Sequence, residues 1–147
     1  MIEIFFDGLC EPVNPGGIAT YGFVIMQNGK QIAEGSGLVG KGEGMTNNVA
    51  EYEAVLNAIV RFKELNLNEP IVIKGDSSVV IYQLSGKWKA KADTPKKYVP
   101  LVKEAMQGLD VQFEWIPREE NALADELTRK AYFENGGEEG KRIKKEE

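Results

Sequence analysis

The sequence predicts an α/β protein with a mixed five-stranded sheet, an antiparallel meander followed by parallel strands, flanked by helices. Three β-rich segments come first, and Asn28-Gly29 between the second and the third is a strong hairpin signal. Apolar residues then recur with a helical period in segments that alternate with short apolar strands. Such alternation is typical of parallel pairing, so the expected order is β-β-β-α-β-α-α-β-α.

The first part of the chain is expected to form the meander. Its elements are strands at residues 2–7, 19–26 and 31–39, a turn at 11–17 and a glycine-rich loop at 40–44. Neither this loop nor Gly16-Gly17 lies between a strand and a helix with the spacing of a dinucleotide-binding motif. Nucleotide binding of that kind is therefore not predicted.

The second part is expected to supply the helices. Asn48 is predicted to cap a helix that ends near Leu65, and Gly108 is a plausible helix stop. Large aromatic residues, with Trp115 and Phe133 among them, are expected to fill the core. The remaining expected elements are strands at 71–75 and 111–116, helices at 77–85, 98–107 and 122–134 with Asn121 as the last cap, and a lysine-rich loop at 87–97.

Length and composition limit the class of protein. The 147 residues suit one catalytic domain at 1–134, followed by a polar, charged tail at 135–147. No apolar run of about 18 residues occurs, and no signal peptide is predicted. The single cysteine, Cys10, has no internal disulfide partner, and the chain contains no histidine, so a zinc site is not expected. A cytoplasmic protein, monomeric by default, is the prediction.

Charge is unevenly distributed along the chain. The net charge is −5, yet residues 87–103 carry six lysines against one acid, Asp93. A local basic patch suits contact with a phosphate backbone, and Trp88 between Lys87 and Lys89 could stack on a base or a sugar. The alternative is a solvated loop of lysines without a ligand.

Four acids are the candidate chemical groups: Asp7, Glu51, Asp76 and Asp125. Asp7 and Asp76 each follow an apolar strand segment, whereas Glu51 and Asp125 lie near helix starts. Carboxylates from four such positions could converge on a hard divalent cation, which prefers oxygen ligands. Each acid also has a structural explanation: a turn at Asp7, a helix cap at Asp76, capping-box spacing at Glu51 and a favourable helix dipole at Asp125.

Four blocks of sequence, in order from about residue 2 to 133, resemble the type 1 ribonuclease H family. The blocks are Phe6-Asp7-Gly8 with Cys10 and Asn14-Pro15-Gly16-Gly17, then Thr46-Asn47-Asn48-Val49-Ala50-Glu51-Tyr52, then Lys74-Gly75-Asp76-Ser77, and finally Trp115-Ile116-Pro117-Arg118-Glu119-Glu120-Asn121 through Ala124-Asp125. The resemblance implies a ribonuclease H-like fold and hydrolysis of the RNA strand of RNA–DNA hybrids, which leaves 5′-phosphate and 3′-hydroxyl ends.

The resemblance also implies two divalent ions per site, normally Mg²⁺, with Mn²⁺ expected to substitute. Their ligands would be the four acids. Two alternatives remain open: a broader nuclease that also cleaves duplex RNA, and a nucleic-acid-binding module without catalysis. A module of that kind would gain nothing from clustered negative charge beside phosphates, so retention of all four acids favours an enzyme.

The family uses a second group of positions to contact its substrate. In this chain they are Cys10, Asn14, Thr46, Asn47 and Asn48. Asparagine amides both donate and accept hydrogen bonds, so they could bind the 2′-hydroxyls that distinguish RNA from DNA. Helix capping is an equally good and compatible explanation for Thr46 and Asn48.

Two departures from the bacterial and vertebrate pattern place the chain nearer a short, histidine-free branch known from archaea and some bacteria. Arg118 occupies the loop in which other members carry a histidine. An arginine stays protonated, so it could stabilise phosphate charge or assist product release but not act as a base; a surface ion pair is its alternative role. The basic helix that many relatives insert is also missing, and Lys87, Trp88 and Lys89 could replace part of it.

Overall fold

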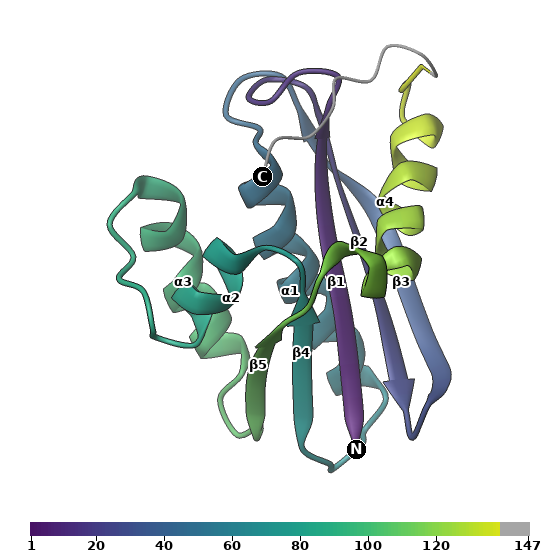
Figure 1. The fold of residues 1–147 in the computed structure, drawn as a ribbon, viewed down its shortest axis with the longest axis vertical. Coiled ribbons are helices and arrows are strands. Elements are labelled where there is room, and N and C mark those ends of the chain that lie inside the picture. Colours follow the sequence, from purple (N-terminus) through teal and green to yellow (C-terminus); the bar gives the residue numbers. More distant parts are fainter. Residues whose placement is uncertain (139–147) are drawn as a thin grey trace.

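The computed structural model describes residues 1–138, and it contains the predicted mixed five-stranded sheet (Figure 1). The strand order is β3-β2-β1-β4-β5, with β2 antiparallel to β1 and β3, and β4 parallel to β1 and β5. The strands are β1 (Ile2–Glu11), β2 (Ile18–Gln27), β3 (Lys30–Lys41), β4 (Ile71–Gly75) and β5 (Val111–Trp115). The predicted tail begins at residue 135, and its part from 139 onward lies outside the described residues.

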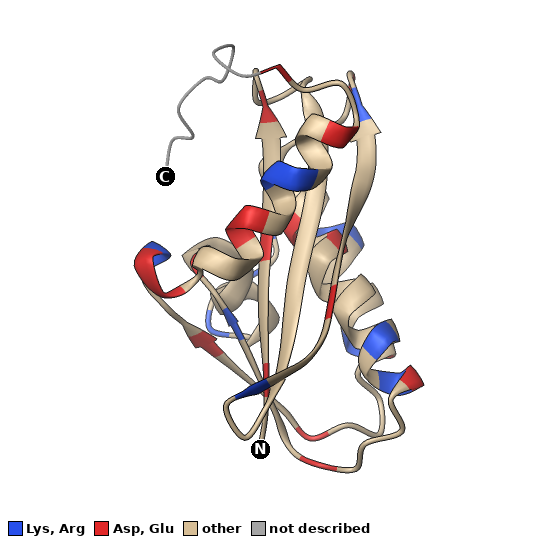
Figure 2. Ribbon diagram, turned by 90° about the vertical axis from the view of Figure 1, so that its right-hand side faces the viewer, with Lys and Arg blue, Asp and Glu red and all other residues tan. Residues whose placement is uncertain are grey.

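Helices cover both faces of this sheet. They are α1 (Asn47–Glu64), α2 (Ser78–Leu84), α3 (Asp93–Ala105) and α4 (Ala122–Glu134), with a short 3₁₀ turn η1 (Arg118–Glu120) before α4. Apolar residues of α1, α2 and α3 pack in one core with Ile2, Ile4 and Phe6 of β1. Helix α4 lies on the opposite face, against β1, β2 and β3 (Figures 1 and 2).

Two glycines show why the faces can be covered so closely. A Cβ atom at Gly8 would lie 2.3 Å from the backbone nitrogen of Glu51 in α1. A Cβ atom at Gly22 of β2 would lie 2.6 Å from the carbonyl oxygen of Ala124 in α4. Gly22 pairs with Asp7, the residue before Gly8, and successive strand residues point to opposite faces. Helices α1 and α4 therefore both touch the backbone of the sheet near Asp7, on opposite faces.

The predicted hairpin and the order of elements are confirmed. Asn28 and Gly29 have φ angles of 52° and 81°, as the tight turn between β2 and β3 requires. Strand β4 has the predicted bounds of 71–75, and Gly108, at φ 82°, follows the end of α3.

Several predicted boundaries are wrong. Strand β1 continues past Asp7 to Glu11, because residues 7–11 stay paired with β2. Asp7 therefore lies inside a strand and not in a turn. Helix α3 begins at Asp93, within the predicted loop, and Pro95 occupies its first turn, where a missing N–H costs nothing. The cap of α1 is Thr46, not Asn48.

The core is built as expected, with two exceptions. Tyr132 is buried, as are the largest apolar residues of β1, β4 and α1. In contrast, Trp115 and Phe133 are 44% and 50% exposed, so the prediction that they fill the core is wrong. Within residues 1–138, no helix is long and apolar enough to cross a membrane.

Candidate active site

Two of the four predicted acids emerge where β1 and β4 part. Parallel pairing between these strands runs from Ile2 beside Ile71 to Phe5 beside Lys74 and then stops. The ring of Phe6 lies against Gly75, where a Cβ atom would be 2.4 Å away. Asp7 follows this point in β1, and Asp76 follows it directly after β4. Because the two strands run side by side up to this point, both side chains lie at the same edge.

Helix α1 brings the third acid to this edge. Its N-terminus is fixed by Thr46, whose Oγ1 accepts a hydrogen bond from the backbone N–H of Val49 at 3.1 Å. The close approach at Gly8 then lets the Glu51 side chain pass beside β1, since a Cβ atom at Gly8 would be 2.6 Å from Glu51 Cγ. A larger residue at position 8 would displace Glu51.

Asp7, Glu51 and Asp76 form one cluster, in which an oxygen of each carboxylate lies within 4.8 Å of the others. Asp7 and Glu51 are each 2% exposed, and the Asp76 side chain is 12% exposed. Asp7 Oδ1 also accepts a hydrogen bond from the backbone N–H of Gly8 at 2.9 Å. Gathering three carboxylates away from water is costly without a compensating positive charge. An all-oxygen donor set of this size fits a hard divalent cation such as Mg²⁺.

The fourth acid, Asp125, lies in the first turn of α4 and is not a member of this cluster. The turn that carries it packs on Gly22, the partner of Asp7, so its backbone lies near the cluster. Its Oδ2, however, accepts a hydrogen bond from Nε of Arg129 at 3.0 Å. The structure therefore brings three of the four predicted acids together and leaves the fourth in an ion pair.

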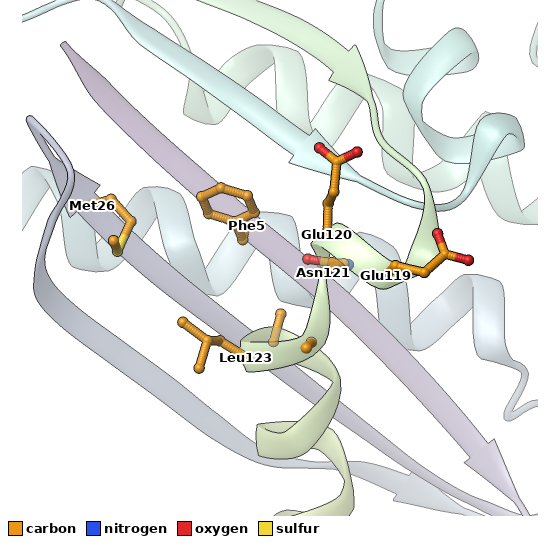
Figure 3. A pocket seen from close by; sticks show the side chains of 8 residues that line it. Phe5, Met26, Glu119, Glu120, Asn121 and Leu123 are labelled. Atoms are coloured by element: carbon orange, nitrogen blue, oxygen red, sulfur yellow. The ribbon is translucent and has the colours of Figure 1, made fainter.

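The start of α4 is tied to β1 by Asn121. Its Nδ2 donates to the carbonyl oxygen of Phe6 at 2.9 Å, and the side chain makes no capping bond to α4. Asn121 is thus the N-cap residue, as predicted, but its side chain binds β1 and does not cap α4. A pocket beside this contact is lined by Phe5, Met26 and Leu123 and by the turn that ends at Asn121 (Figure 3).

Arg118 lies at the rim of the cluster. Its Nε is 3.9 Å from Oδ2 of Asp76, and its side chain is 44% exposed. Trp115, which sequence reasoning assigned to the core, donates from Nε1 to the backbone oxygen of Asp76 at 3.1 Å. Its exposed ring beside the cluster is a feature that the alternating pattern of β5 did not reveal.

The predicted substrate-contacting residues are also brought together, although they come from two distant segments. Asn14 and Asn47 bind each other twice: Asn14 Nδ2 donates to Asn47 Oδ1 at 2.8 Å, and the Asn47 backbone N–H donates to Asn14 Oδ1 at 3.2 Å. Asn14 is exposed and Asn47 is half-buried. Thr46 and Asn48 flank Asn47 and are partly exposed. One polar surface therefore forms beside the cluster.

Cys10 lies buried beneath this polar surface and contacts both of the segments that form it. It is 5% exposed, and its thiol donates to the carbonyl oxygens of Val13 at 3.4 Å and Met45 at 3.5 Å. Burial raises the pKa of the Cys10 thiol, so the reactive thiolate forms less readily. Cys10 thus links the two segments and has no features of a nucleophile.

Lys87, Trp88 and Lys89 lie in the connection between α2 and α3, and all three are exposed. Trp88 is 47% exposed, and its ring packs against Tyr82 of α2 with 5.1 Å between centroids. Lys87 Nζ lies 5.3 Å from the centroid of the same Tyr82 ring. Trp88 and Lys87 therefore both lie against Tyr82, and together with Lys89 they form an exposed aromatic and basic surface.

Comparison with known proteins places this chain in a family. Residues 5–131 match the model of the reverse transcriptase-like family. The crystal structure of LC11-RNase H1 in complex with an RNA/DNA hybrid superimposes with a TM-score of 0.85 and 30% identity, covering 92% of this chain and 99% of that one. The chain belongs to the type 1 ribonuclease H family. Ribonuclease H1 from Halobacterium salinarum is similar as well, with a TM-score of 0.82, 29% identity and coverage of 90% and 98%.

Sequence relatives of this ribonuclease H domain include longer proteins. A bifunctional protein of Mycobacterium tuberculosis is 36% identical over 121 residues, which are 80% of this chain and 32% of that protein. Ribonuclease HI of Halobacterium salinarum is 30% identical over 134 residues, 88% of this chain and 63% of that protein. The chain thus spans about a third of the length of the mycobacterial relative.

Proposed function

We propose that this chain is an endoribonuclease that hydrolyses the RNA strand of RNA–DNA hybrids and leaves 5′-phosphate and 3′-hydroxyl ends. The observation that carries the proposal is the cluster of Asp7, Glu51 and Asp76, held at the edge of a ribonuclease H fold. A neighbour of similar fold was crystallised with an RNA/DNA hybrid. Neither fact alone selects the substrate, but together they favour hybrid cleavage.

Asp7, Glu51 and Asp76 would hold divalent cations, with Asp125 as the fourth ligand once its carboxylate leaves Arg129. Two Mg²⁺ ions, or Mn²⁺ in their place, would supply Lewis-acid stabilisation of phosphate charge and a water of lowered pKa. The buried carboxylates of Asp7 and Glu51 exclude bulk water from one side of this site. Together these oxygen donors would hold the cation beside the middle of β1 and the carboxyl end of β4.

In the proposed reaction, the oxygen of a water molecule bonds to the phosphorus while the bond from phosphorus to the 3′-oxygen breaks. The leaving oxygen gains a proton, and the water loses one. Arg118 cannot take that proton because its guanidinium stays charged. Its place 3.9 Å from Asp76 suits stabilisation of negative charge on the phosphate or on the departing 5′-phosphate end.

The polar surface would select the RNA strand. Asn14, Asn47 and Asn48 supply amide groups beside the cluster, and such groups can bind 2′-hydroxyls across a minor groove. Backbone groups around Cys10 would also contact the RNA strand, whereas Thr46 would bind a phosphate of the DNA strand. Lys87, Trp88 and Lys89 are exposed in the connection between α2 and α3 and would contact the nucleic acid through charge and stacking.

Broader action on duplex RNA is a second candidate, favoured by the short connection between α2 (Ser78–Leu84) and α3 (Asp93–Ala105), which carries no additional basic helix. A binding module without catalysis remains the alternative of a different class. A monomer acting in the cytoplasm is the accompanying prediction. We also propose that residues 1–134 form a single catalytic domain and that residues 135–147 form a polar, charged tail.

The test is cleavage of an end-labelled hybrid in Mg²⁺, in Mn²⁺ and in chelator, with duplex RNA and duplex DNA in parallel. Asp7→Asn should abolish cleavage without loss of the folded circular dichroism spectrum. Asp110→Asn, a change at an exposed acid remote from the cluster in the fold, is the matched control and should cleave normally. Equal activity of wild type and Asp7→Asn would refute the nuclease proposal, and equal rates on hybrid and duplex RNA would select the broader enzyme.

A further inference from the structure

Arg129 and Asp125 form an ion pair on the outer part of α4. Arg129 Nε donates to Asp125 Oδ2 at 3.0 Å, and the two residues are one helical turn apart. Their side chains are 36% and 28% exposed, so solvent reaches the pair. Figure 2 shows acidic and basic segments next to one another along this helix. Asp125 is the one predicted cation ligand that lies outside the cluster within residues 1–138, and this ion pair engages its carboxylate.

The backbone of α4 cannot carry Asp125 toward the cluster, because it is already fixed against the sheet. A Cβ atom at Gly22 would lie 2.6 Å from Ala124 O and 3.0 Å from Thr128 N, so the helix touches β2 directly. Thr20 Oγ1 donates to Thr128 O at 2.8 Å, and Asn121 ties the helix start to β1. The rotamer of Asp125 therefore decides whether its carboxylate joins the other three.

We propose that Arg129 is a positioning residue that holds the Asp125 carboxylate apart from the three-acid cluster and so lowers the affinity of the site for divalent cations. This inference rests on the proposed function, because it takes Asp125 as the fourth ligand. A cation that recruits Asp125 must turn its carboxylate out of the rotamer in which Oδ2 accepts a hydrogen bond from Arg129. The positive charge of Arg129 also opposes a second cation near the same carboxylate.

The arrangement also limits repulsion when no cation is bound. Asp7 and Glu51 are almost fully buried, so a fourth carboxylate beside them would add like charge in a poorly solvated place. Pairing Asp125 with Arg129 keeps that charge at the surface until a cation compensates it. Asp125 would then become a ligand only when a cation is bound, whereas the fold already holds Asp7, Glu51 and Asp76 together.

The experiment is calorimetric titration of Mn²⁺ and of Mg²⁺ into the protein without nucleic acid. Arg129→Ala should bind the cation about two- to fivefold more tightly than wild type, as release of a partly exposed carboxylate predicts. Arg129→Gln should act in the same direction if the alanine variant folds poorly. Arg61→Ala breaks a matched exposed pair with Glu64, 3.6 Å long, and should leave the affinity unchanged.

A double-mutant cycle separates this role from a purely structural one. In an Asp125→Asn background, the change Arg129→Ala should no longer raise cation affinity, whereas a general effect on helix stability would persist. Unchanged or weaker binding by Arg129→Ala and Arg129→Gln would overturn the inference while leaving the nuclease proposal standing. Absence of cation binding by wild type would overturn both.

Discussion

Gly8→Ala is the sharpest test of how α1 delivers Glu51 to the site. The new Cβ atom would lie 2.3 Å from Glu51 N, 2.5 Å from Ala50 C and 2.6 Å from Glu51 Cγ. Two of these atoms are backbone, so no side-chain rotation relieves the clash. Restoring an ordinary contact of 3.4 Å requires the start of α1 to move by roughly 1 Å.

The cost can be bounded from general experience with overpacked cores. Such changes cost about 1–3 kcal/mol, and a clash with backbone belongs near the upper end. Alanine restricts the unfolded chain more than glycine does, which returns about 0.4–1 kcal/mol where the conformation is allowed. A net loss of about 2 kcal/mol of unfolding free energy is expected. A 1 Å displacement of Glu51 should also reduce hybrid cleavage by about 10²-fold.

Urea denaturation measures the loss of stability and the end-labelled hybrid assay measures the loss of cleavage, while cation titration reports whether the acid cluster still binds a cation. Gly37→Ala on β3 is the control, since its Cβ atom would meet only the half-buried Tyr21 ring at 3.0 Å, and that side chain can shift. It should cost less than about 0.5 kcal/mol. If Gly8→Ala matched this control in stability and kept wild-type cation affinity, the close approach of α1 would not be what places Glu51.

Three further predictions concern capping, pH and binding. Thr46→Ala should cost about 1 kcal/mol in urea denaturation because it removes the α1 cap, and Asn48→Ala should cost less; the reverse order would restore Asn48 as the cap. Burial, and then the Glu51 carboxylate, raise the pKa of Tyr52 to about 12. The unfolded chain ionises this group near pH 10, so the unfolding free energy should fall between about pH 10 and 12, and Tyr52→Phe should flatten the fall. Trp88→Ala with Lys89→Ala should weaken hybrid binding and reduce its salt slope by about one, whereas unaltered binding across a salt series would remove this patch from the interface.

The element order and the sheet could be predicted because local signals agreed with the fold. Asn28-Gly29 permits positive φ at both turn positions, which fixes the β2–β3 hairpin. The end of β1 could not be predicted in this way. Gly8 and the polar Glu11 weaken the apolar pattern, yet pairing with β2 continues to Glu11, which is 2% exposed. Tertiary pairing, absent from any local window, extends the strand.

The start of α3 was missed for a different reason. A high density of lysines between residues 87 and 97 suggested a solvated loop, but charge does not prevent a helix whose other face is apolar. Tyr98, Val99 and Val102 form that buried face. Asp93 and Pro95 in the first turn are signals that a search for helix starts could have found.

The exposure of Trp115 also could not be predicted from the local sequence pattern. Trp115 shares the β5 face of Val111 and Phe113, which pack against the core, but it is the last residue of an edge strand and stays exposed. Its indole N–H donates to the Asp76 backbone, so the ring is held at the site rim and not in the core. Only the three-dimensional arrangement of β4 and β5 reveals that role.

Asp125 shows the limit of motif reasoning most directly. Sequence spacing determines which helical turn a carboxylate occupies, and Gly22 and Asn121 determine where that turn lies on the sheet. Neither determines the side-chain rotamer, because Arg129 one turn later offers a competing partner. The backbone positions of Asp7, Glu51 and Asp76 bring these three acids together, whereas Asp125 is paired with Arg129 and would join them only in the proposed cation-bound state. Under the proposed role of Arg129, the cation affinity of the site would depend on the Asp125–Arg129 pair of α4 as well as on the acids of the motif.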